Sequence, residues 1–309
     1  MTKIIRAKPF IKWAGGKGAL LGQINGMLPH VFFTNKDVTY VEPFVGGGAL
    51  LFYVLNHFPT IKRVIINDIN EDLIACYKII KEEPKSLIGV LNGFDNIFWD
   101  LDQEEKKRYY YLIRGKYNQR NSNVLQQAAM FYFLNHTCFN GLYRVNSNSD
   151  FNVPFGKNSI NRICNPDLIM ADHTILNKVN VTILCGSYQQ VLRHIRKFNK
   201  VFFYLDPPYL PISVTSYFKQ YSNSPFEKEE QVELKYFCDI ISNKGGLFML
   251  SNSDCRTEDG ASYFEQLYSE YYCHHVSAKR FINAHGDRRA STSEVLICNY
   301  KNKSFFRNP

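Results

Sequence analysis

The sequence predicts an α/β fold with a doubly wound, Rossmann-like sheet and a helical insertion. The first observation is a strand, a glycine-rich turn, a helix and a second strand ending in an acid, all within residues 38–68. The second is the return of apolar strand patterns after residue 180. The third is a middle segment, 84–136, that lacks β-branched alternation and is expected to be helical.

The first half of the chain alternates strands with helices. A turn at Gly15-Gly16 precedes an expected helix over 19–27. A buried strand is expected over 38–41, and the three glycines Gly46-Gly47-Gly48 separate it from a helix over 49–56. A second strand over 63–66 then ends in Asn67-Asp68, and a helix follows over 70–81.

The second half returns to the sheet after the insertion. Residues 140–159 form a polar, asparagine-rich stretch that is long enough to be functional rather than connective. Strands are expected over 181–184, 201–205, 246–251 and 293–300. We therefore expect one sheet domain from residues 1–83 and 181–309, split by a helical domain over 84–180 with an exposed loop at 139–158.

Composition excludes several classes of protein. The 309 residues are 45% hydrophobic and 21% charged, which is enough to bury a core and unlike a disordered, coiled-coil or collagen-like chain. Purely apolar runs such as VFFYL are far short of the roughly 20 residues that span a membrane. The eight cysteines form no CxxC pair and no Cys/His cluster with zinc spacing. We expect reduced cysteines, no metal site and a cytoplasmic protein without a signal peptide.

Charge favours a polyanionic partner. Thirty-seven basic residues against 28 acidic ones give a net charge of +9. A basic loop near the C-terminus carries Arg280, Arg288 and Arg289, which suit a phosphate backbone that is bound without reading sequence.

The sharpest motif is Asp206-Pro207-Pro208-Tyr209, directly after the VFFYL strand. An open α/β sheet binds ligands beyond the carboxyl ends of its strands. Two prolines stiffen the chain there and fix the directions of the Asp206 carboxylate, the Pro207 carbonyl and the Tyr209 ring. Two acceptors could hold both N–H bonds of an exocyclic adenine amino group and free its lone pair for attack on a methyl group. The tyrosine could stack on a base taken out of the duplex.

Acids at the strand ends suit a cationic methyl donor. Glu42 precedes Pro43-Phe44 and the three glycines, which let the backbone approach a ligand closely. The glycine spacing differs from the GxGxxG pattern of dinucleotide binding, so NAD is disfavoured. Asp68 stands where an acid commonly holds ribose hydroxyls. Together with Asp206, these acids suit the sulfonium and ammonium groups of S-adenosyl-L-methionine (AdoMet).

These motifs together resemble the Dam family of DNA adenine-N6 methyltransferases, of the D12 class and with the α order of motifs. The likeness is closest to GATC-methylating enzymes of type II restriction-modification systems and covers about residues 8–300. The segments that carry it are Lys12-Trp13-Ala14-Gly15-Gly16-Lys17, Glu42-Pro43-Phe44-Val45-Gly46-Gly47-Gly48, Asn67-Asp68, Asn140-Gly141-Leu142-Tyr143-Arg144, Phe151-Asn152-Val153-Pro154-Phe155-Gly156 and Asp206-Pro207-Pro208-Tyr209.

The resemblance implies site residues, and these remain expectations. The fold would be a Rossmann-like AdoMet-dependent methyltransferase sheet with a helical target-recognition insertion. The implied catalytic residues are Asp206, Pro207 and Tyr209. The implied AdoMet-binding residues are Trp13, Lys17, Glu42, Phe44, Gly46, Gly48, Asp68 and Asp206. The implied DNA-binding residues are Lys12, Phe139, Asn140, Leu142, Arg144, Asn146, Pro154, Arg288 and Arg289.

Within the expected recognition loop, the resemblance gives individual roles. Arg144 matches the family's guanine-reading arginine, in agreement with the bidentate pairing of arginine to guanine O6 and N7. Leu142 and Pro154 match apolar contacts to a thymine methyl, and Lys12 matches a lysine at the outer guanine. Phe139 stands where a family member carries tyrosine, so it keeps the stacking ring and lacks the hydroxyl.

The implied activity is methyl transfer to adenine N6 of double-stranded DNA in a bacterium or phage, by a monomer without a membrane partner. A cognate restriction endonuclease would act on the same site without contacting the enzyme. Two other substrates stay open, an RNA adenine and a protein glutamine amide, although glutamine methyltransferases carry Asn in place of Asp206. An inactive DNA-binding relative is the remaining alternative, and the intact acids argue against it.

Overall fold

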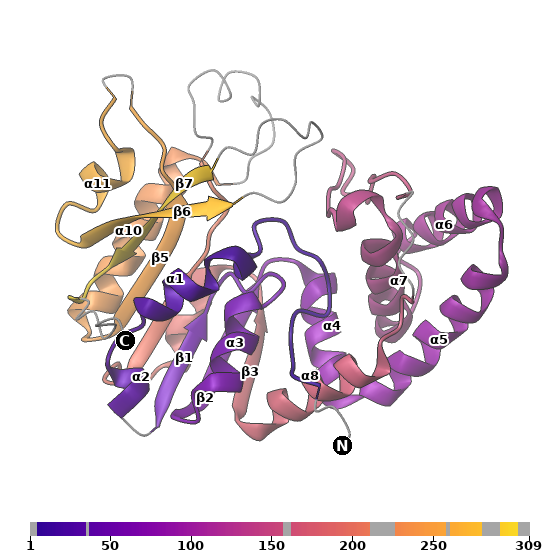
Figure 1. Ribbon diagram of the computed structural model, residues 1–309, viewed down its shortest axis with the longest axis horizontal. Coiled ribbons are helices and arrows are strands. Elements are labelled where there is room, and N and C mark those ends of the chain that lie inside the picture. The colour runs from indigo at the N-terminus through magenta and orange to yellow at the C-terminus, as the bar shows by residue number, and fades with distance from the viewer. Residues whose placement is uncertain are drawn as a thin grey trace. The chain divides into compact units, whose positions relative to one another are not determined.

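The computed structural model describes residues 5–34, 37–156, 162–210, 226–257, 260–279 and 291–301 (Figure 1). The chain forms two compact units. The first unit comprises Met1–Gly16, Val45–His57 and Asn67–Ser187, and the second comprises Lys17–Phe44, Phe58–Ile66 and Tyr188–Pro309. The expected domain boundaries at residues 83 and 181 stay a prediction, and each unit is described by itself.

The second unit is built around most of a seven-stranded sheet. Its strand order is β2 (Ile61–Asp68), β1 (Val38–Glu42), β4 (Val201–Leu205), β5 (Leu247–Ser253), β7 (Ser291–Cys298) and β6 (Tyr272–Lys279). The first four are parallel to one another, whereas β7 is antiparallel to both β5 and β6. The α/β, Rossmann-like sheet expected from the sequence is therefore confirmed.

The central strands of this sheet are buried on both faces. All five residues of β4 are buried, as are four of the five residues of β1. Continuous apolar runs of this kind are typical of parallel strands covered on both sides. Because β1 pairs with β2 on one side and with β4 on the other, the winding direction reverses between β1 and β4. Ligands bind at the carboxyl ends of strands at such a reversal.

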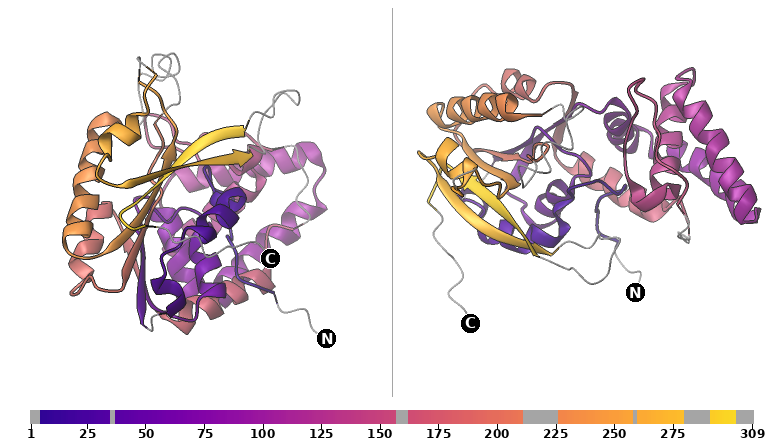
Figure 2. Two further views of the ribbon diagram at one scale, coloured as in Figure 1. Left: turned by 60° about the vertical axis from the view of Figure 1, so that its left-hand side comes forward. Right: turned by 90° about the horizontal axis from the view of Figure 1, so that it is seen from above.

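Short helices complete the second unit. They are η1 (Lys17–Leu20), α1 (Leu21–Gly26), α2 (Val31–Thr34), η3 (Tyr188–His194), α10 (Lys228–Asn243) and α11 (Tyr263–Leu267). The helix expected over 19–27 is instead a 3₁₀ turn followed by six α-helical residues. Leu20 provides no side-chain cap, and Gly18 and Gly22 weaken helix formation at this point. The longer α10 packs on β5 (Figure 2).

The first unit is mainly helical. Its elements are α3 (Ala49–His57), α4 (Glu71–Glu82), α5 (Pro84–Asp100), α6 (Gln103–Asn118), α7 (Val124–Thr137), η2 (Phe139–Gly141), α8 (Pro166–Lys178) and β3 (Asn180–Cys185). The helix α7 packs against α4, α5 and α6 and buries nine of its 14 residues. A helix that is apolar on most sides belongs in the centre of a bundle. The expected helical middle segment is thus confirmed.

Helix ends in the first unit follow the sequence. Asn70, Asn123 and Asn165 each accept a hydrogen bond from the backbone N–H three residues later. Asp102 and Glu105 form a reciprocal capping box at the start of α6. No helix among the residues that the structure describes has the length and apolarity to cross a bilayer.

One buried acid gives the first unit a pH-dependent stability. Asp172 on α8 is fully buried, and its Oδ1 accepts a hydrogen bond from the Lys8 backbone N–H at 3.0 Å. Burial raises the pKa of Asp172 to about 8. The folded chain therefore holds a proton that the unfolded chain has lost, so this group lowers stability progressively as the pH rises from about 4 to 8.

We expect the substitution Asp172→Asn to flatten that decline. The amide stays neutral at every pH, so the variant lacks the decline that Asp172 causes. Between pH 5 and 8 its free energy of unfolding should fall less steeply than that of the wild type, by up to about 1.4 kcal/mol per pH unit. Urea denaturation at four pH values measures this slope. Asp167→Asn, at an exposed position on the same helix, is the control. Equal slopes in wild type and Asp172→Asn would contradict the prediction.

Candidate active site

Two acids predicted from the sequence lie at the carboxyl edge of the second unit's sheet. Glu42 is the last residue of β1 and is 3% exposed, and Asp206 directly follows β4. The two strands pair in parallel, with Val41 opposite Phe203, so their ends meet at the reversal point. The Tyr40 hydroxyl donates to Oε2 of Glu42 at 2.8 Å, which orients this carboxylate.

Both described contacts of the Asp206 carboxylate fall on one oxygen. Lys17 Nζ lies 2.9 Å from Oδ1, and the Ser251 hydroxyl donates to the same oxygen at 2.9 Å. Within the described residues, Oδ2 of Asp206 receives no hydrogen bond. Lys17 is 5% exposed, so its ammonium group is held close to this carboxylate with little water around it. The carboxylate is therefore fixed by one oxygen and can accept hydrogen bonds with the other.

The tyrosine of the same motif, Tyr209, is contacted both at its hydroxyl and at its ring. Its hydroxyl donates to Oε2 of Glu294 at 2.7 Å, and Lys17 Nζ lies 4.5 Å from the centre of its ring. Burial, followed by the negative charge of Asp206, raises the pKa of Tyr209 well above its ordinary value. The phenol therefore stays protonated and acts as a ring and a donor rather than as a base.

The backbone of the motif is fixed by neighbouring elements. The Gln231 amide on α10 donates to the Pro208 carbonyl at 3.2 Å, and the Ser253 hydroxyl at the end of β5 donates to the Leu210 carbonyl at 2.7 Å. The sequence assigned no role to Gln231 or Ser253. A signal did exist for Ser253, because Ser251-Asn252-Ser253 stand where Dam-family enzymes have similar residues.

Phe44 completes the described part of this edge. Its ring stacks on Tyr188 with centroids 5.1 Å apart and meets Phe226 edge-on at 5.9 Å. The structure thus gathers Lys17, Glu42, Phe44, Asp206 and Tyr209 within the second unit.

The remaining expected cofactor residues lie in the first unit. Gly46 donates its backbone N–H to Oδ2 of Asp68 at 3.0 Å, and the Asn70 N–H donates to Oδ1 at 3.0 Å. Burial raises the pKa of Asp68, while these backbone donors oppose the shift. The two oxygens of a carboxylate together accept about four hydrogen bonds, so Asp68 can still receive hydroxyl donors.

The glycine turn leaves no room for side chains. Gly46 and Gly48 have positive φ values of 47° and 73°. A Cβ on Gly46 would lie 2.7 Å from Cδ1 of Trp13, and one on Gly48 would collide with the Tyr77 hydroxyl. That hydroxyl donates to the Gly46 carbonyl at 3.0 Å. Glycine is therefore required here both by conformation and by close packing.

Trp13 packs directly against this turn. Its ring is half-buried and stacks on Tyr143, with centroids 5.6 Å apart and an angle of 22° between the planes. Tyr143 belongs to the expected recognition loop, so one aromatic pair joins the glycine turn to that loop within the first unit.

The start of the expected recognition loop is anchored by a buried amide. The Asn135 side chain accepts from the Lys12 N–H at 2.9 Å and donates to the carbonyls of Lys12 and Gly141, at 2.8 and 3.1 Å. Asn140 and Gly141 both adopt positive φ, and Phe139 is 49% exposed. Asn135 is a positioning residue that the sequence analysis missed, because nothing distinguishes it from other polar residues on a helix.

The rest of the loop is a short hairpin whose turn is held by side-chain hydrogen bonds. Val145 and Phe151 form an antiparallel bridge, and the Asn146 Oδ1 accepts from the N–H groups of Asn148 and Asp150. The amide of Asn118 on α6 pairs with both backbone groups of Phe151. These hydrogen bonds favour a single conformation of the hairpin.

Three of the residues that the sequence analysis selected are exposed on this hairpin. Arg144 is exposed, and its Nε donates to Oδ1 of Asn152 at 2.7 Å. Leu142 is 36% exposed, and Pro154 is exposed. Arg288 and Arg289, like Arg280, lie outside the described residues.

The sheet order, the antiparallel β7 and the acids at the ends of β1 and β4 define a Rossmann-like methyltransferase fold. The model of the D12 class N6 adenine-specific DNA methyltransferases matches residues 13–282. The chain therefore belongs to this family and is an adenine-specific DNA methyltransferase.

Relatives cover nearly the whole chain. The type II methyltransferase M.MjaIII of Methanocaldococcus jannaschii is 40% identical, over 96% of this chain and 100% of its own length. The type II methyltransferase M1.LlaDCHI of Lactococcus lactis is 33% identical, over 96% and 97%. The DNA adenine methylase of Escherichia coli K12 is 29% identical, over 94% of each chain.

Proposed function

We propose that this enzyme transfers a methyl group from AdoMet to N6 of adenine within GATC in double-stranded DNA, with the adenine flipped out of the helix. The observation that carries the proposal is the Asp206 carboxylate, which is fixed through Oδ1 and open at Oδ2 at the end of β4.

The donor set fits a cationic methyl donor. Glu42 and Asp206 supply two carboxylates at one sheet edge, and Lys17 forms an ion pair with Asp206. Asp68 has lone pairs left for ribose hydroxyls. Trp13, Phe44, Gly46 and Gly48 would supply the aromatic and close-backbone surfaces. When bound, AdoMet supplies an activated methyl group, and the protein residues position the acceptor.

Asp206 and Pro207 would activate the acceptor nitrogen. Oδ2 of Asp206 and the Pro207 carbonyl would each accept one N–H of the adenine amino group. This arrangement favours a pyramidal nitrogen whose lone pair is available for in-line attack, so catalysis rests mainly on positioning. The amino proton released in the reaction has the Asp206 carboxylate as its acceptor.

Tyr209 would hold the flipped base. Lys17 lies over one face of its ring, and Glu294 anchors the hydroxyl, so the ring keeps a fixed orientation for stacking. Methyl transfer to N6 requires the base to leave the duplex stack. Stacking on an aromatic ring offsets part of the free-energy cost of unstacking.

The hairpin over 139–156 would read the target. Its exposed Arg144, Leu142 and Pro154 match the donor and apolar groups that recognise guanine and a thymine methyl. The choice of GATC rests on the likeness of this loop to Dam enzymes. The names of the type II relatives support a place in restriction-modification.

The test is transfer of a labelled methyl group from AdoMet to a duplex with one GATC, compared with a duplex in which that site is GTAC. We expect label only in the first duplex, recovered as N6-methyladenine after digestion. Label in both duplexes would reject GATC and keep the reaction. Label in neither, but in RNA or in a glutamine-containing peptide, would overturn the proposal.

A further inference from the structure

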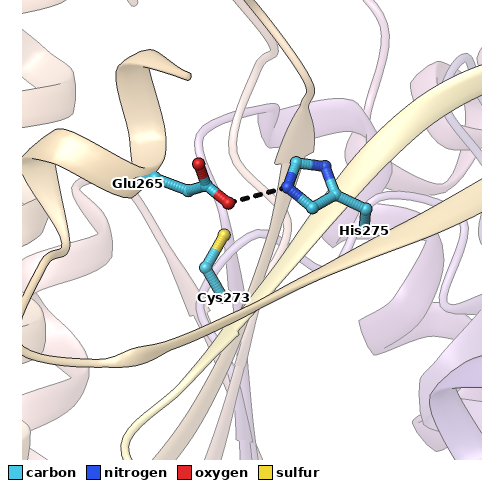
Figure 3. Close-up of side chains that lie close together, drawn as sticks. All are labelled: Glu265, Cys273 and His275. Carbon is cyan, nitrogen blue, oxygen red and sulfur yellow. Dashed lines mark hydrogen bonds and ion pairs between the residues drawn. The ribbon is translucent and has the colours of Figure 1, made fainter. Parts of the chain in front are cut away.

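Three side chains with metal-ligating atoms meet in the second unit, apart from the residues of the proposed active site. Glu265 comes from α11, and Cys273 and His275 come from β6 (Figure 3). One ligand atom from each lies within 4.8 Å of the others, and His275 Nε2 is 2.8 Å from Oε1 of Glu265. Figure 3 shows the cysteine sulfur directed toward the same point.

The strand geometry explains why these side chains converge. Cys273 and His275 are two residues apart, so they project from the same face of β6, while His274 projects from the other. Glu265 is in the first turn of α11, a helix whose N-cap Ser262 accepts from the Glu265 N–H. Because the third ligand comes from another element, no spacing in the sequence indicates the cluster.

A further carboxylate orients the histidine. Nδ1 of His275 lies 3.1 Å from Oδ2 of Asp254, which is 6% exposed at that side chain. The Ser293 hydroxyl and Arg256 both donate to the same oxygen, at 2.8 and 3.1 Å. A carboxylate that accepts a hydrogen bond from Nδ1–H leaves Nε2 unprotonated as the ligand atom, and metal-bound histidines usually have such a partner.

We propose that Glu265, Cys273 and His275 bind one Zn²⁺ ion. Thiolate, imidazole and carboxylate are the donors that zinc prefers, and three protein ligands leave a fourth position for water. One thiolate and one carboxylate neutralise the ion, and the thiol proton leaves to solvent on binding. The side chains of His275 and Glu265 are 38% and 48% exposed, so both can adjust to tetrahedral coordination.

The ion would link β6, at the edge of the sheet, to α11. β6 pairs with β7 and ends the strand order of the sheet, so no described strand lies on its other side. Zinc would link this edge to α11 by coordinate bonds. In the competing arrangement no metal binds. A protonated His275 forms ion pairs with Asp254 and Glu265, and Cys273 takes no part.

Cobalt substitution distinguishes the two arrangements. The full chain is stripped of metal with a chelator, kept reduced with a phosphine and titrated with Co²⁺ alone. Zinc coordination by Cys273 predicts a near-ultraviolet thiolate-to-cobalt band that saturates at one equivalent and disappears on addition of one equivalent of Zn²⁺. A wild-type protein without that band would overturn the proposal.

Variants assign the ligands. Cys273→Ala should abolish the thiolate band, and Asp254→Asn should weaken Zn²⁺ binding about 10- to 100-fold in equilibrium dialysis. His274→Gln, on the opposite face of the same strand, should leave both unchanged. His275→Gln, checked for folding by circular dichroism, keeps the thiol and should lose tight zinc binding. A band that survives in Cys273→Ala, or a loss in His274→Gln equal to that in His275→Gln, would reject the site.

Discussion

The substitution Asp206→Ala should lower the rate of methyl transfer by roughly 10²–10⁴-fold, the range for losing a well-placed group that handles a proton in the transition state. The variant loses the open Oδ2 acceptor and also the partner of Lys17 and Ser251. Binding of the duplex should change little, because the expected base-reading side chains lie in the first unit. Single-turnover transfer of a labelled methyl group measures the rate, and fluorescence anisotropy measures DNA affinity.

Two further variants separate chemistry from charge. Asp206→Asn keeps the size and one acceptor oxygen but loses the ion pair with Lys17, so it should be slower than the wild type and faster than Asp206→Ala. Ser251→Ala removes one hydrogen bond to Oδ1 and should cost roughly tenfold or less. If Asp206→Ala turned over at the wild-type rate, the proposed role of the motif would be wrong.

The strands that flank this carboxylate could be predicted from the sequence because their signals are local. The run over 201–205 is β4 without change, and the strand expected over 38–41 is one residue shorter than β1. The strand expected over 293–300 is shifted, since β7 spans Ser291–Cys298. Apolar runs and strand-end acids depend on neighbours in sequence, so they remain visible without a structure.

Features that depend on long-range pairing could not be predicted. Ser251 reaches the Asp206 carboxylate from β5, and Gln231 holds Pro208 from α10, a helix that the sequence analysis did not assign. Asn135 and Lys12 meet across 123 positions of the chain. In each case the residue is an ordinary polar side chain, and only the packing of its element gives it a role.

Arg144→Ala should remove discrimination at one base pair while leaving binding to DNA in general nearly intact. In the structure the Nε of Arg144 is held by Asn152 at 2.7 Å, which leaves the two terminal nitrogens of the guanidinium to face guanine O6 and N7. The loss should be about 1–3 kcal/mol at one guanine, a factor of roughly 5–150 in relative methylation rate. Competition between duplexes that differ at that base pair measures it.

The matched control is Arg144→Lys, which keeps the positive charge but lacks the planar pair of donors. It should lose discrimination almost as fully as alanine while retaining more affinity, because lysine still attracts phosphate as a point charge. Asn152→Ala frees the guanidinium and should give an intermediate loss, since Nε is then no longer fixed. An equal loss on every duplex in Arg144→Ala, with full rescue by lysine, would reassign this residue to the phosphate backbone.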